Sequence, residues 1–154
     1  MKMLYTLKRF SKGFLYAARG IAYNIKNERN FRFHITAMVW VIVLSMFYDL
    51  SRTEYAVLIL TFSSVIACEA VNTAVERAVD FTSKNENRLA RAAKDSSAAA
   101  VLIAALFSVA VAVCLFWDTA VFAEIGAFFA GRPLCAAAVV VMAVLSFIFI
   151  FKGI

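Results

Sequence analysis

The chain has 154 residues, of which 64% are hydrophobic and 17% are charged, and its formal net charge is +6. The apolar fraction exceeds the roughly 45–50% typical of soluble domains, so the composition excludes an ordinary soluble protein and predicts an integral membrane protein. We expect one compact unit with no second soluble domain and no nucleic-acid partner.

Apolar residues repeat at helical spacing within the first thirty residues, and basic residues fill much of the remainder. The apolar series consists of Leu7, Phe10, Phe14, Ala18, Ile21 and Ile25. This pattern predicts an amphipathic helix that lies in the cytoplasmic interface and is attracted to anionic lipid. The alternative is a solvated basic tail, which the apolar stripe disfavours.

Four apolar stretches follow, and each is close to the ~17–25 residues that a membrane helix needs, although the first is short unless it begins a little earlier. They are Phe33–Tyr48, Tyr55–Val79, Ser96–Trp117 and Leu134–Phe151. Backbone groups cannot bond to water in lipid, and the alternation expected of a barrel is absent, so the stretches should be helices. We predict an all-α membrane protein with an interfacial helix, three core spans (residues 1–117), and an external linker with a fourth span (residues 118–154). The linker is expected to form a short interfacial helix.

Basic residues are distributed unevenly between the connections. Eight precede the first span and four lie in the predicted loop at 81–95, whereas the loops after the first and third spans carry only Arg52 and Arg132. By the positive-inside rule, the N-terminus and the loop at 81–95 are cytoplasmic, and the fourth span returns the C-terminus to that side. We therefore expect a multi-pass protein of the cell membrane.

A polar stripe interrupts the second span near its cytoplasmic end. Its members are spaced i, i+3, i+7 and i+11, so they share one face of a helix; they are Glu69, Asn72, Glu76 and Asp80. An ionisable group at this depth costs about 2.5–3.5 kcal/mol on insertion scales, which favours a functional site over a stabilising role. The stripe does not continue into the outer half of the span, so the site should open to one side only.

Other polar residues share this cytoplasmic boundary, namely Glu28 before the first span and Lys94 and Asp95 before the third. Two carboxylates there suit Mg²⁺, which accepts one or two carboxylates together with phosphate oxygens, and a lysine supplies charge for phosphates. A deeper carboxylate can accept a proton from a lipid hydroxyl. The combination predicts phosphoryl transfer from a nucleotide to a lipid alcohol. The sequence has no Walker-type loop or soluble-kinase signature, so the architecture must be a different one.

Three segments carry a resemblance to the prokaryotic diacylglycerol kinase family, which includes the undecaprenol kinases. They are NERNFRFH at residues 27–34, EAVNTAVERAVD at 69–80 and AKDSSAAAVL at 93–102. The resemblance covers about residues 5–117 with the spans in the same order. The first segment looks most like the undecaprenol kinases of Gram-positive bacteria.

The resemblance implies an ATP-dependent and Mg²⁺-dependent lipid kinase that assembles as a homotrimer with active sites shared between subunits. Carried over by motif, Glu69 resembles the catalytic base, and Glu28 and Glu76 resemble the Mg²⁺–ATP carboxylates. Positions that contact the nucleotide or the active site are matched by Asn72, Lys94, Asp95, Tyr16 and Arg9. Asp80, at the end of the polar stripe, is a lesser member of the predicted site. The expected product is undecaprenyl phosphate, and the alternative substrate is diacylglycerol.

The chain departs from the family pattern in two places. The loop Ser83–Arg88 lacks a histidine that some members have near the adenine, and the tail beyond Asp118 adds a fourth helix.

Several readings of the same residues stay open at this point. Glu69 or Glu76 could form structural ion pairs with Arg77 or Lys94. Lys94 could instead snorkel at a helix end, and Asp80 could be a helix-end charge. Ser96 and Ser97 are interpreted as first-turn residues, with Asp95 as a possible N-cap. A function of another class is a proton-conducting or cation-conducting membrane subunit.

Overall fold

The computed structural model describes residues 2–82 and 87–153, with side chains described from residue 12 onward. These residues form helices and contain no strand. The helices are α1 (Lys2–Asn27), α2 (Arg29–Ser45), α3 (Arg52–Thr82), α4 (Arg88–Phe116), α5 (Thr119–Ala130) and α6 (Pro133–Lys152). The prediction of an all-α membrane protein is confirmed.

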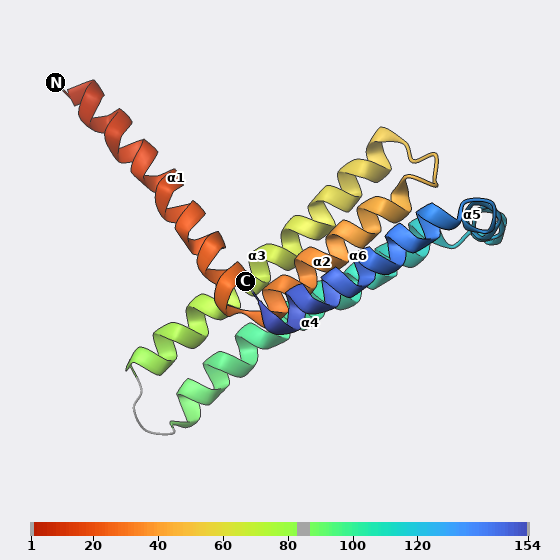
Figure 1. The fold of residues 1–154 in the computed structure, drawn as a ribbon. Helices are drawn as coiled ribbons and strands as arrows, with labels where there is room; N and C mark the ends of the chain where they lie inside the picture. The colour runs from red at the N-terminus through yellow and green to blue at the C-terminus, as the bar shows by residue number, and fades with distance from the viewer. Residues whose placement is uncertain (1, 83–86, 154) are drawn as a thin grey trace.

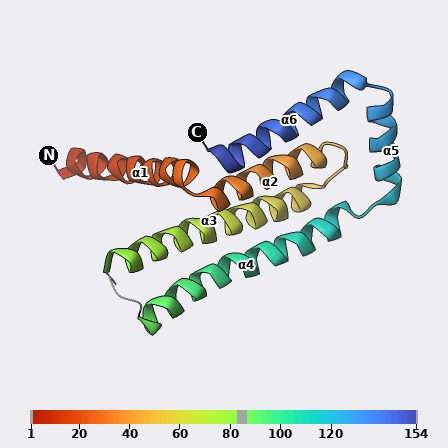
Figure 2. The ribbon, with the colours of Figure 1, turned by 60° about the horizontal axis from the view of Figure 1, so that its bottom comes forward.

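Four of the helices lie side by side in the order α6, α2, α3, α4 (Figure 2), in agreement with the pairs of helices that pack together. Helix α5 joins α4 to α6 at one end of this bundle, and α1 projects away from the other end (Figure 1). The C-terminus of α6 therefore returns to the junction between α1 and α2. The last turn of α3 and the first turn of α4 lie at this same end of the bundle, so the helix ends that carry the predicted site are gathered there (Figure 2).

Helix boundaries are set by recognisable caps. Ser51 and Glu54 form a capping box at the start of α3, because the Ser51 N–H donates to Glu54 Oε2 at 2.7 Å and the Glu54 N–H donates to Ser51 Oγ at 3.3 Å. Asn87 and Asp118 accept hydrogen bonds from backbone N–H groups in the first turns of α4 and α5. Helix α6 begins with Pro133 and ends at Lys152, and it is followed by Gly153, whose φ is +73°.

The predicted spans are all helical, with some differences at their ends. The first begins earlier than its apolar stretch, at Arg29, which gives α2 a length of 17 residues. Helices α3, α4 and α6 are long and apolar enough to cross a membrane, and α2 is near the lower limit of length. The short helix predicted in the linker is confirmed as α5, and the N-terminal helix as α1; their places at the membrane surface stay predictions.

The predicted loop at residues 81–95 is too long, and Asp95 as an N-cap is wrong. Helix α3 continues to Thr82 and α4 already begins at Arg88, with Asn87 as its cap. The prediction equated the helix with the apolar stretch, but the segment RLARAA at 88–93 consists of good helix formers that extend the helix beyond it. Lys94 and Asp95 therefore lie on the second turn of a rigid helix.

Among the side chains that the structure describes, more polar than apolar residues are buried. The buried apolar side chains are Phe31, Leu58, Val65 and Phe116, whereas the buried polar ones are Asn24, Arg32, Thr36, Ser45, Glu69, Asn72 and Thr73. Lipid is as apolar as these side chains, so helices in a bilayer gain little from burying hydrocarbon and associate through close packing and hydrogen bonds. The buried polar residues therefore mark where helices meet.

Candidate active site

The polar stripe of α3 runs from the packed interior to the exposed end of the helix. Glu69 is 2% exposed and Asn72 is 7% exposed. Glu76 is half-buried, and Asp80 is exposed. The four positions lie within one helix, as predicted, so they form a graded series that leads from the water-accessible end to a buried carboxylate.

Asn72 links the stripe to α4. Its Nδ2 donates to Glu76 Oε1 at 3.0 Å, and its Oδ1 accepts from the Ser97 hydroxyl at 2.7 Å. The amide is thereby fixed at both ends, and Glu76 is held in one orientation. Sequence analysis missed Ser97 as a site residue and interpreted it as an ordinary first-turn residue. The signal was its position three residues after Lys94, which places both on one face of α4.

Glu69 is the most buried carboxylate of the stripe. The residue is 2% exposed, and among the residues that the structure describes no hydrogen bond or ion pair to its side chain is found. A buried carboxylate without a partner costs free energy and is poor for stability. Its oxygens are available to accept a proton or a hydrogen bond from a ligand.

Glu28 lies at the break between α1 and α2, where the backbone is extended. Its Oε1 forms an ion pair with Arg77 Nη2 of α3 at 2.7 Å, and the Arg77 guanidinium also lies 5.4 Å from the centre of the Tyr23 ring. The pair connects the start of α2 to the C-terminal half of α3. Arg77 thus pairs with Glu28, and the alternative in which it neutralises Glu69 or Glu76 is wrong.

Lys94 reaches across from α4 to α3. Its Nζ lies 2.9 Å from Asp80 Oδ1, and both side chains are partly exposed. The alternative in which Lys94 pairs with Glu69 or Glu76 is therefore also wrong. An exposed pair of this kind contributes little stability, so it leaves Lys94 free to exchange its partner for a phosphate group.

The remaining predicted site residues are not drawn into this cluster. Asp95 is exposed on α4, and Tyr16 is 61% exposed on α1. No hydrogen bond joins either of them to the stripe within the described ranges. Arg9 belongs to α1, but its side chain lies outside the described residues, as does most of the loop that lacks the histidine.

Glu28 and Glu76 place two carboxylates at this end of the bundle, and each already has one partner, Arg77 for Glu28 and Asn72 for Glu76. The described part of the chain contains no group of three or more side chains that could hold a metal ion by themselves. This donor set fits Mg²⁺, which keeps several waters and binds through one or two carboxylates plus substrate phosphates. It does not fit a structural metal with an all-protein shell.

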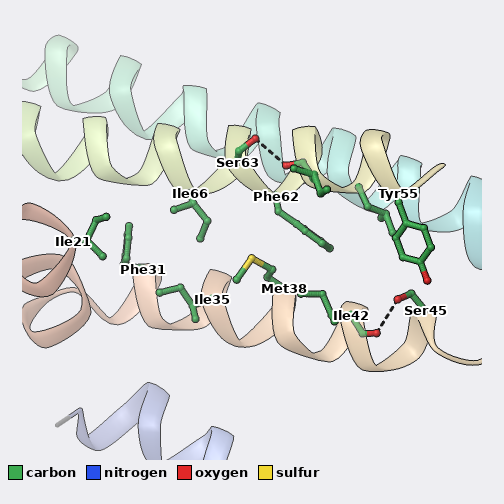
Figure 3. A pocket seen from close by; sticks show the side chains of 12 residues that line it. Ile21, Phe31, Ile35, Met38, Ile42, Ser45, Tyr55, Phe62, Ser63 and Ile66 are labelled. Atoms are coloured by element: carbon green, nitrogen blue, oxygen red, sulfur yellow. Dashed lines mark hydrogen bonds between the residues drawn. The ribbon is translucent and has the colours of Figure 1, made fainter. Parts of the chain in front are cut away.

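Two open spaces adjoin the stripe. A cleft of about 370 Å³ separates α1 from α3, and its walls include Ala17, Gly20, Ala74 and Arg77. A larger groove of about 580 Å³ lies between α2 and α3, where Phe31, Ile35 and Met38 face Phe62 and Ile66 (Figure 3). Ile66 precedes Glu69 by three residues, so the apolar groove ends within one helical turn of the buried carboxylate.

The chain matches known proteins over the region that contains these residues. The family model described as prokaryotic diacylglycerol kinase matches residues 15–116. The chain is 36% identical to the undecaprenol kinase of Bacillus subtilis over 110 residues, which are 71% of this chain and 89% of that protein. It is 42% identical to the diacylglycerol kinase of Synechocystis over 103 residues, which are 66% of this chain and 59% of that longer protein. A diacylglycerol kinase of Helicobacter pylori is 33% identical over 100 residues, which are 65% of this chain and 78% of that protein.

The match spans α2, α3 and α4 and the C-terminal half of α1, and it excludes α5 and α6. The buried stripe and both interhelical ion pairs fall within it. The chain belongs to the prokaryotic diacylglycerol kinase family, and it is a membrane-embedded lipid kinase that uses ATP.

Proposed function

We propose that this kinase phosphorylates the hydroxyl of undecaprenol and forms undecaprenyl phosphate at the cytoplasmic face of the cell membrane. The observation that carries the proposal is the graded stripe of α3, which ends in the buried and unpaired Glu69 beside an apolar groove. A soluble nucleotide can approach the exposed end of the stripe, while hydrocarbon can occupy the groove. The similarity to an undecaprenol kinase supports the choice of lipid.

Glu69 is the general base in this proposal. The lipid hydroxyl oxygen attacks the γ-phosphorus of ATP while its proton passes to the Glu69 carboxylate, and the bond from the γ-phosphorus to the bridging oxygen breaks to release ADP. The burial of Glu69 keeps water away from the proton acceptor, which favours transfer to the lipid hydroxyl over hydrolysis of ATP.

Glu28 and Glu76 would hold Mg²⁺ together with the phosphates of ATP. When bound, the ion neutralises charge on the phosphates. Glu76 is oriented for this role by Asn72, and Glu28 by Arg77. Lys94 then leaves Asp80 to bind phosphate oxygens, and Asp95, Tyr16 and Arg9 contact the nucleotide.

The active enzyme is proposed to be a homotrimer whose sites draw residues from neighbouring subunits. The exposure of Tyr16 on a helix that projects from the bundle supports this arrangement, because that helix has surface free to cover a second copy (Figure 1). The uneven distribution of basic residues supports a cytoplasmic position for the site.

Diacylglycerol is the second candidate substrate, and the 42% identity to a diacylglycerol kinase favours it. The test is a mixed-micelle assay in which the purified protein receives labelled ATP, Mg²⁺ and equal amounts of the two lipids. We expect label mainly in undecaprenyl phosphate. Preferential labelling of phosphatidic acid would replace the proposed substrate, and a folded protein that labels no lipid alcohol would refute the proposed reaction.

A further inference from the structure

The C-terminal helix α6 lies outside the region that matches the family, yet it is bonded to the segment that carries Glu28. The contact is made by Arg32, which is in the first turn of α2 and is 6% exposed. The Arg32 guanidinium donates through Nε and Nη2 to the Ile150 carbonyl of α6, at 3.2 and 3.1 Å. Its Nη1 donates to the carbonyls of Ile25 and Lys26, at 3.0 and 3.1 Å.

All three acceptors belong to the last turns of helices. Ile25 and Lys26 are at the end of α1, and Ile150 is near the end of α6. The last four carbonyls of a helix lack partners within it, and these ends carry partial negative charge. Two such ends repel one another when they meet, so their approach depends on a cation between them. Arg32 supplies that charge and satisfies acceptors on both sides.

Further contacts align α6 along α2. Trp40 Nε1 donates to Ser146 Oγ at 3.2 Å, and the Arg29 guanidinium lies 5.9 Å from the centre of the Phe151 ring. Gly153 lies directly against the Arg32 side chain, since a Cβ built on it would be 3.5 Å from the guanidinium carbon. Its φ of +73° favours glycine at this position. The contacts are spaced as expected for two antiparallel helices that are in contact along their length.

The bonded segment includes the elbow between α1 and α2, which consists of Glu28 alone. The Glu28 N–H donates to the Asn24 carbonyl, and the Arg32 N–H donates to the Glu28 carbonyl at 3.3 Å. The angle at this residue decides where its carboxylate lies relative to Arg77 and α3. The hydrogen bonds of Arg32 hold the last turn of α1 against the first turn of α2, so they also fix the position of Glu28.

We infer that Arg32 is a positioning residue and that α6 acts as a strut, which together fix the elbow so that Glu28 faces the nucleotide end of α3. The inference rests on the proposed role of Glu28 in binding Mg²⁺–ATP. It gives α6 a part in the reaction of this chain, although no residue of α6 belongs to the site. Lysine cannot replace Arg32 fully, because a single ammonium group cannot span two helix ends as a planar guanidinium does.

The test compares Arg32→Lys with Ser146→Ala in the full chain. Ser146→Ala removes a hydrogen bond between α2 and α6 but leaves the elbow untouched, so it serves as the matched control. We expect Arg32→Lys to raise the KM for Mg²⁺–ATP by about fivefold to tenfold, as for the net loss of one hydrogen bond, with kcat changed less than about twofold. Ser146→Ala should leave both constants near the wild-type values.

Hydrogen exchange followed by mass spectrometry provides a second measurement that does not depend on activity. In Arg32→Lys, amides at 21–28 and at 148–153 should both exchange faster, and in Ser146→Ala those at 21–28 should not. Unchanged exchange at both helix ends, or an unchanged KM despite faster exchange, would overturn the inference. A loss of kcat in proportion to unfolded protein would also overturn it. If the wild-type protein phosphorylates no lipid alcohol, the proposed function fails while the exchange experiment still decides whether Arg32 joins the two helices.

Discussion

The two halves of helix α3 bury side chains of different polarity. In the half that begins at Arg52, the buried side chains are Leu58 and Val65, whereas in the half that ends at Thr82 they are Glu69, Asn72 and Thr73. Both halves belong to one continuous helix packed against its neighbours. The apolar half fills space between helices. The polar half joins α3 to α4 through Asn72 and Ser97, and its Glu69 carboxylate has no partner among the residues that the structure describes.

This difference separates stability from function along a single helix. Glu69 is a buried carboxylate that forms no bond with any described residue, so replacing it by a neutral group should not lower the stability of the fold. Replacing Leu58 by a smaller residue removes packing contacts and should lower it. Substitutions in the polar half should therefore affect the reaction more than the fold, and substitutions in the apolar half should do the reverse. The three predictions below test this separation, beginning with the largest effect on activity.

Glu69→Gln should lower kcat by about a thousandfold, because glutamine fills the same space but cannot accept the proton of the lipid hydroxyl. Mg²⁺–ATP binding and folding should be retained. The measurement is initial rates of lipid phosphorylation together with nucleotide affinity. Loss of nucleotide binding as the main defect would show that Glu69 belongs to the nucleotide site instead.

Glu54→Gln is the matched control at the opposite end of the helix. Glu54 Oε2 accepts from the Ser51 backbone N–H, so its role is to cap α3. The same chemical change there should leave kcat unchanged. A comparable loss of activity in both variants would break the distinction between the two halves.

Glu76→Gln should have an intermediate effect and raise the KM for Mg²⁺–ATP by about tenfold, because it removes one of two proposed carboxylates from the cation. The Asn72 bond to position 76 can persist, since the glutamine carbonyl still accepts. The KM should be measured at several Mg²⁺ concentrations, and the defect should lessen as Mg²⁺ increases. An unchanged KM would remove Glu76 from the nucleotide site.

The sequence predicted the helical spans and the stripe because their signals are local. Apolar length identifies a span, and a spacing of three or four residues identifies a helix face, so Glu69, Asn72 and Glu76 were expected on one side of α3. The start of α4 was misplaced because Arg88 and Arg91 are charged yet continue a helix. Hydropathy reports where lipid begins, and a helix can extend beyond that point.

Interactions between distant segments could not be predicted in the same way. Nothing local to Arg32 indicates that its acceptors include a carbonyl 118 residues later, and any backbone carbonyl can serve as an acceptor. The pairing of Arg77 with Glu28 likewise depends on the angle between α1 and α2, which a single residue decides. The sequence suggested a division into a core at 1–117 and an extension at 118–154, and this division stays a prediction.

Leu58→Ala should have the smallest effect on the reaction and a measurable effect on the fold. Leu58 is 4% exposed and lines the apolar groove between α2 and α3, so its truncation removes packing and widens that groove at a cost of about 2 kcal/mol. We expect a lower midpoint of thermal inactivation in micelles, while kcat at saturating lipid and the KM for Mg²⁺–ATP stay near the wild-type values at a permissive temperature. Leu60→Ala is the control, because Leu60 is 66% exposed on the same helix and its loss leaves no cavity within the chain. If Leu58→Ala changed kcat as strongly as Glu76→Gln changes KM, packing and chemistry would be coupled along α3, and the two halves would act as one unit.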